Sequence, residues 1–320
     1  MDISRRELMR LGGGAALMSA LPGAVRAANL RVLSGSAFGS AWRLVLPETN
    51  DAPVARACIQ AVVARIDARM SPFRQDSELA CFNAAGIVAA SDETCFLART
   101  ALMLARDSAG AFNPTLAPWG RRYGFGPVAI APSRPAGSFQ DVCIEGKNLK
   151  TVTPGLSLDL CAIAKGYALD EITRALDGLD FLIELGGEVA ARGRHPSGRP
   201  WRMGIERPGT NKLQRMIEAD SRALATSGDE AQGYTVGPRR YAPVLDPLTR
   251  KPVNNGVASV SVLAPTGLMA DGLATAAMVL GPERSRLLLK TYDASALFLL
   301  RGSDGLEEMD VLGFVTGEPS

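Results

Sequence analysis

The sequence contains very little histidine, since His195 is the only one among 320 residues. A zinc site built from several histidines therefore cannot form, and a Ser-His-Asp triad would have to use segment 193–198. Because Gly, Pro and Ser surround His195 there, we expect it to lie in an exposed turn. Zinc-enzyme and serine-hydrolase chemistry are thus poor explanations of this chain.

The sequence also lacks an excess of charge of either sign. The 35 Lys and Arg residues nearly balance the 33 Asp and Glu residues, which leaves a net charge of +2. The basic residues are scattered rather than grouped with aromatic residues, so we expect no nucleic-acid partner. Neither a Walker lysine nor a Gly-x-Gly-x-x-Gly segment is present, so the common nucleotide-binding motifs are missing as well.

Long hydrophobic runs are missing too, because no segment approaches the ~20 apolar residues that span a bilayer. Residues 1–27 instead have the features of a twin-arginine export signal: Arg5 and Arg6, a short apolar and glycine-rich run, and small residues at a cleavage site. We therefore expect residues 28–320 to form a single domain in the periplasm, exported in the folded state.

The cysteines form no Cys-x-x-Cys pair, and their odd number leaves at least one thiol unpaired. One or two disulfides are possible in an oxidising compartment. For most of these residues, however, we expect the role of a small buried apolar side chain. The five are Cys58, Cys81, Cys95, Cys143 and Cys161.

Strand-like and helix-like segments alternate irregularly, without repeated β-α-β units, which predicts an α+β fold. Helices are expected over residues 53–70, 94–108 and 268–280, and the last should end at Gly281 and Pro282. In the first helix, Val54, Cys58, Val62 and Ile66 should share the buried face, after an N-cap at Asp51. Strands are expected over residues 30–33, 41–46, 156–160, 181–185, 189–193, 201–205, 222–226, 258–264, 296–300 and 306–311, and a polar loop over 208–214.

The segment from Leu158 to Asp170 has the pattern of an anion site. A strand-like alternation ends at Asp159, small residues follow, and a helix begins with Lys165 and Gly166 near its start. Backbone N–H groups, a lysine and an acid that could hold a metal would then face one place. This combination suits a metal-bridged phosphate better than a simple carboxylate ligand.

Asp271 and Thr275 lie four residues apart at the start of a predicted helix, so both oxygens project from one face. A carboxylate, a hydroxyl and phosphate oxygens are ligands that Mg²⁺ prefers. An acid and a threonine also stabilise a helix N-terminus without any metal. Together with Asp159 and Lys165, the metal interpretation is favoured.

Three short polar segments can approach a ligand. Segment 226–229, Thr-Ser-Gly-Asp, should form a tight turn whose hydroxyls could bind a ligand, although a plain turn is the default explanation. Asp246 stands at a strand end before a turn, and Gly186 and Gly187 permit close approach of a ligand or backbone just before Glu188.

In this order, the motifs resemble the ApbE family, the FAD:protein FMN transferases, from Gly35 to about Gly313. The matching segments are Met70-Ser71, Asp76-Ser77-Glu78-Leu79, Phe82-Asn83, Gly110-Ala111-Phe112-Asn113-Pro114-Thr115, Asp159 to Tyr167, Gly186-Gly187-Glu188, Ala225-Thr226-Ser227-Gly228-Asp229, Asp246-Pro247, and Ala270-Asp271 with Ala274-Thr275.

The resemblance implies an α+β fold with a T-fold-like core and with FAD in a cleft between two lobes. It implies FAD contacts at Phe38, Ala111, Phe112, Asn113, Asp159, Lys165 and Val244, to which Thr226 and Ser227 add candidate hydroxyl donors. It also implies Mg²⁺ bound by the carbonyl of Ala162, by Asp271 and by Thr275.

The implied reaction moves FMN from FAD to a threonine of an acceptor protein and releases AMP. Lys165 and the metal would stabilise charge on the diphosphate. The acceptor is expected to carry a Ser/Thr-Gly-Ala-Thr-like motif and to be a membrane respiratory subunit.

Three positions depart from the family pattern. Pro243 stands where many members have a histidine that is a candidate base, three residues before the Asp-Pro pair, and we hypothesise that Asp246 replaces it. Asn113 stands where aspartate is common, and Phe38 where methionine is common. Pro243 keeps two alternatives open: an FAD-binding carrier or maturation factor, as in nitrous oxide respiration, and an FAD pyrophosphatase.

Overall fold

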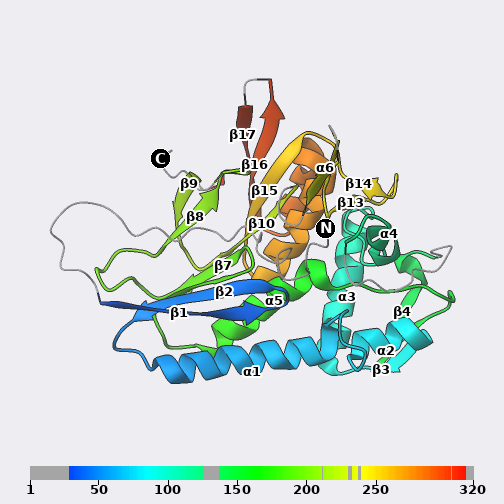
Figure 1. The fold of residues 1–320 in the computed structure, drawn as a ribbon, viewed down its shortest axis with the longest axis horizontal. Helices are drawn as coiled ribbons and strands as arrows, with labels where there is room; N and C mark the ends of the chain where they lie inside the picture. Colours follow the sequence, from blue (N-terminus) through cyan, green and yellow to red (C-terminus); the bar gives the residue numbers. More distant parts are fainter. Residues whose placement is uncertain are drawn as a thin grey trace, which may run out of the picture.

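The computed structural model describes residues 29–125, 137–210, 212–229, 233–236, 239–303 and 305–314. The expected export signal over residues 1–27 lies outside the described residues. Helices and strands are mixed without β-α-β alternation, so the predicted α+β class is confirmed (Figure 1).

The helices of the described residues begin and end as follows: α1 Ala52–Met70, α2 Glu78–Ala85, α3 Asp92–Asp107, α4 Ala117–Arg122, α5 Cys161–Ala175 and α6 Gly267–Thr291, with a short 3-10 helix at Phe139–Asp141.

The main sheet of the described residues is antiparallel and has the order β1-β2-β6-β7-β10-β15-β16-β17. Its strands are β1 Leu30–Ala37, β2 Ser40–Pro47, β6 Phe181–Leu185, β7 Glu188–Arg192, β10 Ala223–Gly228, β15 Val257–Ala264, β16 Ser295–Gly302 and β17 Gly305–Val311. A small sheet has the order β3-β5-β4, with β3 Ile87–Ala89, β4 Val142–Glu145 and β5 Asn148–Thr151. Separate hairpins pair β8 Arg202–Glu206 with β9 Leu213–Glu218, β11 Tyr234–Val236 with β12 Arg239–Tyr241, and β13 Leu245–Asp246 with β14 Lys251–Pro252.

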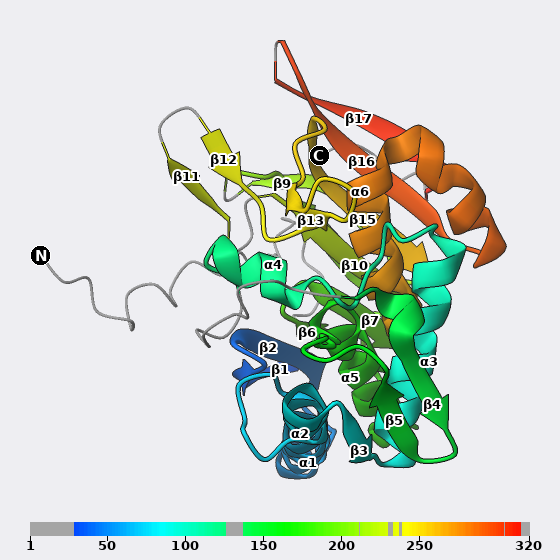
Figure 2. The same ribbon diagram turned by 90° about the vertical axis from the view of Figure 1, so that its right-hand side faces the viewer.

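In the central strands of the main sheet both faces are buried, and successive side chains point to opposite faces and so enter different cores. In β2, Leu44 and Leu46 join the larger core beneath α5 and α6, whereas Val45 joins a second core that includes Met203 of β8 and Ile217 of β9. Helix α1 packs outside α5 (Figure 1), and the small sheet stands beside α3 (Figure 2). The α5–α6 layer is thus held firmly against the sheet.

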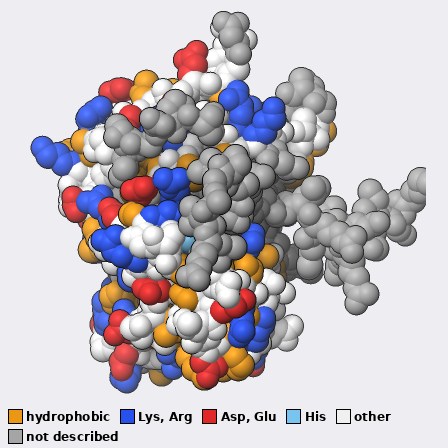
Figure 3. All heavy atoms as spheres, turned by 90° about the vertical axis from the view of Figure 1, so that its left-hand side faces the viewer, with side chains coloured by type: hydrophobic (Ala, Val, Ile, Leu, Met, Phe, Trp, Pro, Cys, Tyr) orange, Lys and Arg blue, Asp and Glu red, His pale blue; other side chains and the backbone are white. Residues whose placement is uncertain are grey.

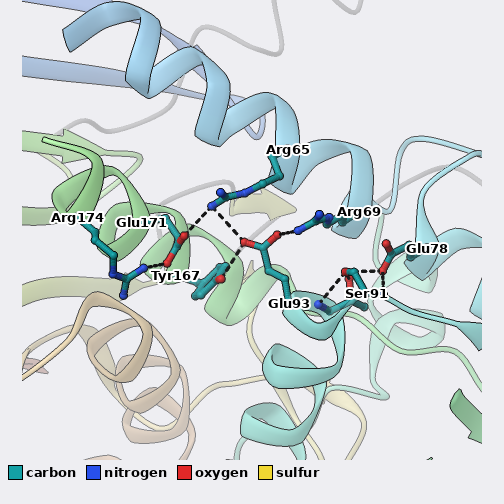
Figure 4. A network of polar contacts seen from close by, with 9 residues as sticks. Arg65, Arg69, Glu78, Ser91, Glu93, Tyr167, Glu171 and Arg174 are labelled. Atoms are coloured by element: carbon teal, nitrogen blue, oxygen red, sulfur yellow. Dashed lines mark hydrogen bonds and ion pairs between the residues drawn. The ribbon is translucent and has the colours of Figure 1, made fainter. Parts of the chain in front are cut away.

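A polar network fixes α5 against α1 and α3 (Figure 4). The hydroxyl of Tyr167 in α5 donates to Glu93 in α3 over 2.8 Å, and Glu93 also pairs with Arg65 and Arg69 of α1. Arg65 reaches Glu171 of α5 as well, at 2.6 Å. Because charged partners from all three helices meet at one point, the start of α5 has a defined position.

Most predicted elements are present, but several begin or end at other residues than predicted. The first two strands are longer than expected and meet through the two-residue turn Phe38–Gly39, whose φ values of 52° and 75° are those of a tight hairpin turn. The last predicted helix does not stop at Gly281; it kinks there, with φ 74° and ψ 175°, and continues to Thr291. The polar loop expected over 208–214 is largely present as the connection between β8 and β9, although β9 already begins at Leu213; α2 was not anticipated.

Two predictions about buried segments differ from the structure: the strand over 156–160 was wrong, and the buried face of α1 was right for Val62 and Ile66 but wrong for Val54. Residues 156–160 form no strand, because both backbone groups of Leu158 are bonded to the Asn83 side chain, at 2.7 and 2.9 Å, instead of to another strand. In α1, the buried face runs through Ala55, Ile59, Val62 and Ile66, so Val54 is 56% exposed.

The cysteines are all free, and only Cys95 is buried, so the expectation that most serve as buried apolar side chains was wrong. On the face shown in Figure 3, acidic and basic side chains are interspersed, as expected from the balanced composition. Among the described residues, no helix combines the length and the apolar character needed to cross a membrane.

Candidate functional site

The site is built where α5 crosses α6, at two glycines in contact. A Cβ atom on Gly166 would lie 2.1 Å from the carbonyl oxygen of Gly267, and one on Gly267 would lie 2.6 Å from that of Gly166. Only glycine permits this approach of two backbones. The crossing therefore places residues at the start of α5 directly beside the first turn of α6.

Carboxylates from each helix complete the crossing. Asp170 of α5 accepts hydrogen bonds from the backbone N–H groups of Gly267 and Leu268, at 2.7 and 2.9 Å, and so caps α6. Asp271 of α6 accepts from the N–H of Gly166 at 3.0 Å. In a regular helix this N–H points toward the carbonyl four residues earlier, that of Ala162, so the predicted approach of Asp271 to that carbonyl stays a prediction.

Lys165 lies at the same crossing and forms an ion pair with Glu188, the first residue of β7. The Glu188 side chain is 1% exposed and the Lys165 side chain 25% exposed. Burial opposes the charge of Lys165, but Glu188 and Asp271 outweigh it and hold the pKa of Lys165 above its ordinary value. Burial also raises the pKa of Glu188, which the Lys165 charge opposes, and raises the pKa of Asp271 to about 6.

Two hairpin turns meet at one end of the sheet, and one of them lies against Lys165. A Cβ atom on Gly186 would be 2.9 Å from Ser40, which follows the Phe38–Gly39 turn, and 3.4 Å from Cδ of Lys165. The other glycine of this β6–β7 turn is Gly187. A Cβ atom on it would lie 3.9 Å from the carbonyl oxygen of Thr226 in β10. Phe38, Lys165 and Thr226 thus come from distant segments to the same end of the sheet.

The loop before α4 joins the site through the residues that precede α5. The N–H of Asp159 donates to the carbonyl of Pro114 at 2.7 Å, and Oδ1 of Asp159 accepts from the N–H of Cys161 at 2.8 Å. Asn113 accepts from the N–H and hydroxyl of Thr115 at 3.0 and 2.7 Å. Asn113 and Asp159 are therefore neighbours, as the family resemblance implies.

The remaining predicted residues of the FAD site contribute differently. The side chain of Phe112 is 1% exposed and belongs to the core, so only its backbone can face a ligand. Ala111 beside it is 8% exposed. Ser227 is half-buried at the end of β10, and Val244 is half-buried against the larger core.

Asp246 is engaged in the turn that follows it. Its carboxylate accepts from the N–H of Leu248 and from the hydroxyl of Thr249, each at 2.9 Å. A carboxylate can accept further bonds, so a role as a base stays a prediction. Asp246 and the half-buried Pro243 have no contact with Lys165 or Asp271 among the interactions of the described residues.

Two polar residues lie in settings that differ from the predicted ones. His195 is only 9% exposed, because its ring packs edge-on against Trp201 and its Nδ1 lies 2.7 Å from the Ser197 hydroxyl. The tight turn predicted for 226–229 is instead the end of β10, where Thr226 bonds the Ser261 hydroxyl at 2.8 Å. The adjacent Asp229 is buried and pairs with Arg301.

The donor set at the crossing fits a hard divalent cation that also binds a ligand. Asp271 is 5% exposed, the half-buried Thr275 lies one helical turn beyond it, and one buried oxygen of Glu188 has no hydrogen-bond partner. In the described part of the chain, no group of three or more His, Cys, Asp or Glu side chains is placed to hold a metal ion. Lys165, Glu188 and Asp271 together carry one net negative charge when ionised, so a cation would have to accompany a diphosphate here.

Glu188 and Asp170 are the site residues that sequence reasoning did not assign. The Gly186-Gly187 pair indicated a close approach at this point, and the acid that follows it was the available signal for Glu188. Asp170 gave no such signal, because its partners Gly267 and Leu268 lie almost a hundred residues away.

The fold is that of an α+β protein in which a half-buried lysine and two buried carboxylates meet where two helices cross. Residues 38–298 match the ApbE family. The FAD:protein FMN transferase of Vibrio cholerae is 32% identical over 309 residues, which cover 90% of this chain and 92% of that protein. This chain therefore belongs to the ApbE family.

Solved structures of two relatives show the same fold. The flavin transferase ApbE from Vibrio cholerae aligns with a TM-score of 0.78 and 31% identity, over 89% of this chain and 98% of that one. The apo form of the Pseudomonas stutzeri flavinyl transferase ApbE aligns with a TM-score of 0.78 and 31% identity, over 89% of this chain and 95% of that one.

Proposed function

We propose that this protein is an FAD:protein FMN transferase, which moves FMN from FAD to a threonine hydroxyl of an acceptor protein and releases AMP. The observation that carries the proposal is the crossing of α5 and α6, where Gly166 meets Asp271 and where the neighbouring Lys165 pairs with Glu188. The names of the family relatives that match nearly the whole chain support the same activity.

The diphosphate of FAD would lie between Lys165 and Asp271, with the Asn113 and Asp159 loop on one side and the Phe38 turn on the other. The ammonium of Lys165 would stabilise negative charge on the diphosphate as it develops. Ala162, Asp271 and Thr275 would hold Mg²⁺, which when bound supplies charge neutralisation at the diphosphate oxygens. The acceptor hydroxyl forms a bond to the FMN phosphorus, the bond from that phosphorus to the bridging oxygen breaks, and AMP leaves with that oxygen.

A base must take the proton of the acceptor hydroxyl, and here the chain departs from its family at Pro243. We propose that Asp246 fills this role, from its position on β13 beside Val244. Unchanged transfer by an Asp246→Ala protein would overturn this assignment. Pro243 also supports the second candidate functions, FAD carriage and FAD hydrolysis to FMN and AMP.

One assay separates the three functions. The protein is incubated with FAD, Mg²⁺ and an acceptor fragment that carries a Ser/Thr-Gly-Ala-Thr-like motif, and AMP, free FMN and acceptor-bound flavin are measured. Acceptor-bound flavin with equimolar AMP supports transfer. AMP with free FMN identifies a pyrophosphatase, and intact retained FAD identifies a carrier; either result overturns the proposed transfer.

We further propose that the protein acts in the periplasm on a membrane respiratory subunit. The twin arginine and the short apolar run within residues 1–27 support export in the folded state. Replacement of Arg5 and Arg6 by Lys should retain the protein in the cytoplasm, as measured by cell fractionation. Undiminished export of this variant would contradict the proposal.

A further inference from the structure

We propose that Glu188 is a positioning residue for Lys165: its buried carboxylate aims the lysine ammonium at the diphosphate. The inference rests on the proposed function, because it concerns the group that Lys165 would contact in FAD. Glu188 itself would touch neither FAD nor the acceptor.

The contacts of the ammonium leave one donor available. Nζ of Lys165 donates to Oε1 of Glu188 and lies 3.5 Å from the carbonyl oxygen of Gly186. An ammonium has three N–H groups, so these two contacts leave the third free to point away from the β6–β7 turn. The Lys165 side chain is 25% exposed while that of Glu188 is 1% exposed, so the accessible side of the pair belongs to the lysine.

Stability alone is a weak explanation for this pair. Burying two charges costs several kcal/mol per ion, and well-packed apolar residues often replace such pairs without loss of stability. Here the second oxygen of Glu188, Oε2, is buried without a hydrogen-bond partner. An incompletely bonded carboxylate beside Lys165 is therefore better explained by its effect on the lysine.

Lysine needs this support more than arginine would. Its ammonium is a point charge on a flexible four-carbon stem, and it has no planar geometry of its own to match a phosphate. Glu188 is held by the β6–β7 turn, where Gly186 and Gly187 have φ values of 65° and 109°, and where Glu184 accepts from the N–H of Gly187 at 3.0 Å. The turn thus fixes Glu188, and Glu188 fixes the lysine.

The matched variants are Glu188→Gln and Glu184→Gln, which make the same change on two buried acids of one hairpin. Glu184 is 5% exposed, and its carboxylate accepts from the N–H of Gly187. Glutamine keeps an oxygen that accepts the same bond, so Glu184→Gln removes a buried charge and leaves the turn in place. We expect Glu188→Gln to lower kcat for FMN transfer about tenfold to a hundredfold, because small misplacements of a reacting group have effects of that size. Its KM for FAD should change less than kcat, and Glu184→Gln should stay within about twofold of the wild type in both. Equal kinetic effects of the two variants would overturn the inference.

A double-mutant cycle tests whether Glu188 acts through Lys165. In a Lys165→Met protein, Glu188→Gln should change kcat by less than about twofold, and it should raise the melting temperature because it removes an unpaired buried charge. This pair of variants also serves if Glu188→Gln alone folds poorly. An undiminished effect of Glu188→Gln in the Lys165→Met protein would show that Glu188 acts independently, and would overturn the inference. If the wild type itself neither binds FAD nor transfers FMN, the proposed function fails. If the wild type transfers FMN but the effects of the Glu188 and Lys165 substitutions on kcat are additive, only the role of Glu188 is overturned.

Discussion

At the scale of single residues, the groups proposed to bind the diphosphate are all present, whereas the position proposed for the acceptor's base is altered. Lys165 and Asp271 both lie at the α5–α6 crossing, whereas Pro243 offers no proton acceptor where many family members have histidine. Under the proposed function, we therefore expect FAD to bind, and we expect the rate of transfer to depend on how the acceptor hydroxyl loses its proton.

A Pro243→His variant should transfer FMN faster than the wild type. A positioned general base contributes about 10²–10⁴-fold in other enzymes, so we expect a rise of at least tenfold in kcat at saturating FAD. Pro243 is half-buried beside Val244, so the new imidazole would start next to a predicted FAD contact. Acceptor-bound flavin measured over time gives the rate, and an unchanged or lower rate would mean that the missing histidine does not limit transfer.

The pKa of the single histidine, His195, tests whether its ring is buried. Burial, with a smaller contribution from the Arg199 charge, lowers the pKa of His195 below its ordinary 6.5. Between the two pKa values the unfolded chain binds more protons than the folded one, so this residue reduces stability as pH falls through 6.5.

With one histidine, an NMR titration of the imidazole follows a single group. We expect a midpoint below 6.5 in the folded protein and near 6.5 in urea. A folded-state midpoint at or above the value in urea would contradict the buried position of the ring.

At the scale of elements, the crossing of α5 and α6 determines whether the site exists. Gly166 meets the backbone of Gly267, which cannot move without shifting the whole helix. Gly272 in α6 instead faces the tip of Leu104, where an added Cβ would lie 2.5 Å from Cδ1 and 2.9 Å from the side chain of Ile163.

We therefore expect Gly166→Ala to lower the free energy of unfolding by about 3 kcal/mol and to abolish FAD binding. Gly272→Ala should cost less than about 1 kcal/mol, because flexible side chains can yield and alanine favours the helix. Urea denaturation and FAD titration measure both effects. Equal losses in the two variants would show that the glycine contact at the crossing has no special role.

Sequence patterns predicted these elements to different extents. Asp271 and Thr275 share a helix face by local spacing, so their proximity could be predicted from position alone. The alternation of apolar and polar residues over 156–160 predicted a strand, because alternation reflects which side chains are buried. The Asn83 side chain, which bonds the backbone of this segment in place of another strand, is distant in sequence. Gly281 and Pro282 predicted a helix end but produced a kink, because α6 continues beyond them.

At the scale of the whole molecule, the family and the fold class could be predicted, because ordered motifs extend over nearly the whole chain. The pairing of Lys165 with Glu188 and the contact of Gly166 with Gly267 could not be predicted in the same way. Each joins residues from different elements, and glycine carries no signal that identifies its partner. Both contacts are set by tertiary packing, which local sequence patterns do not encode.

The central claim is that the α5–α6 crossing binds the FAD diphosphate together with a divalent cation. Calorimetric titration of FAD with and without Mg²⁺, for the wild type and for Asp271→Asn, tests it most directly. Asparagine can still accept from the N–H of Gly166 but carries no charge, so the fold should be retained. We predict that Mg²⁺ strengthens FAD binding by the wild type at least about tenfold, or about 1.4 kcal/mol, and leaves the variant unaffected. Equal FAD affinity of the wild type with and without Mg²⁺, or an undiminished Mg²⁺ effect in the variant, would contradict the claim.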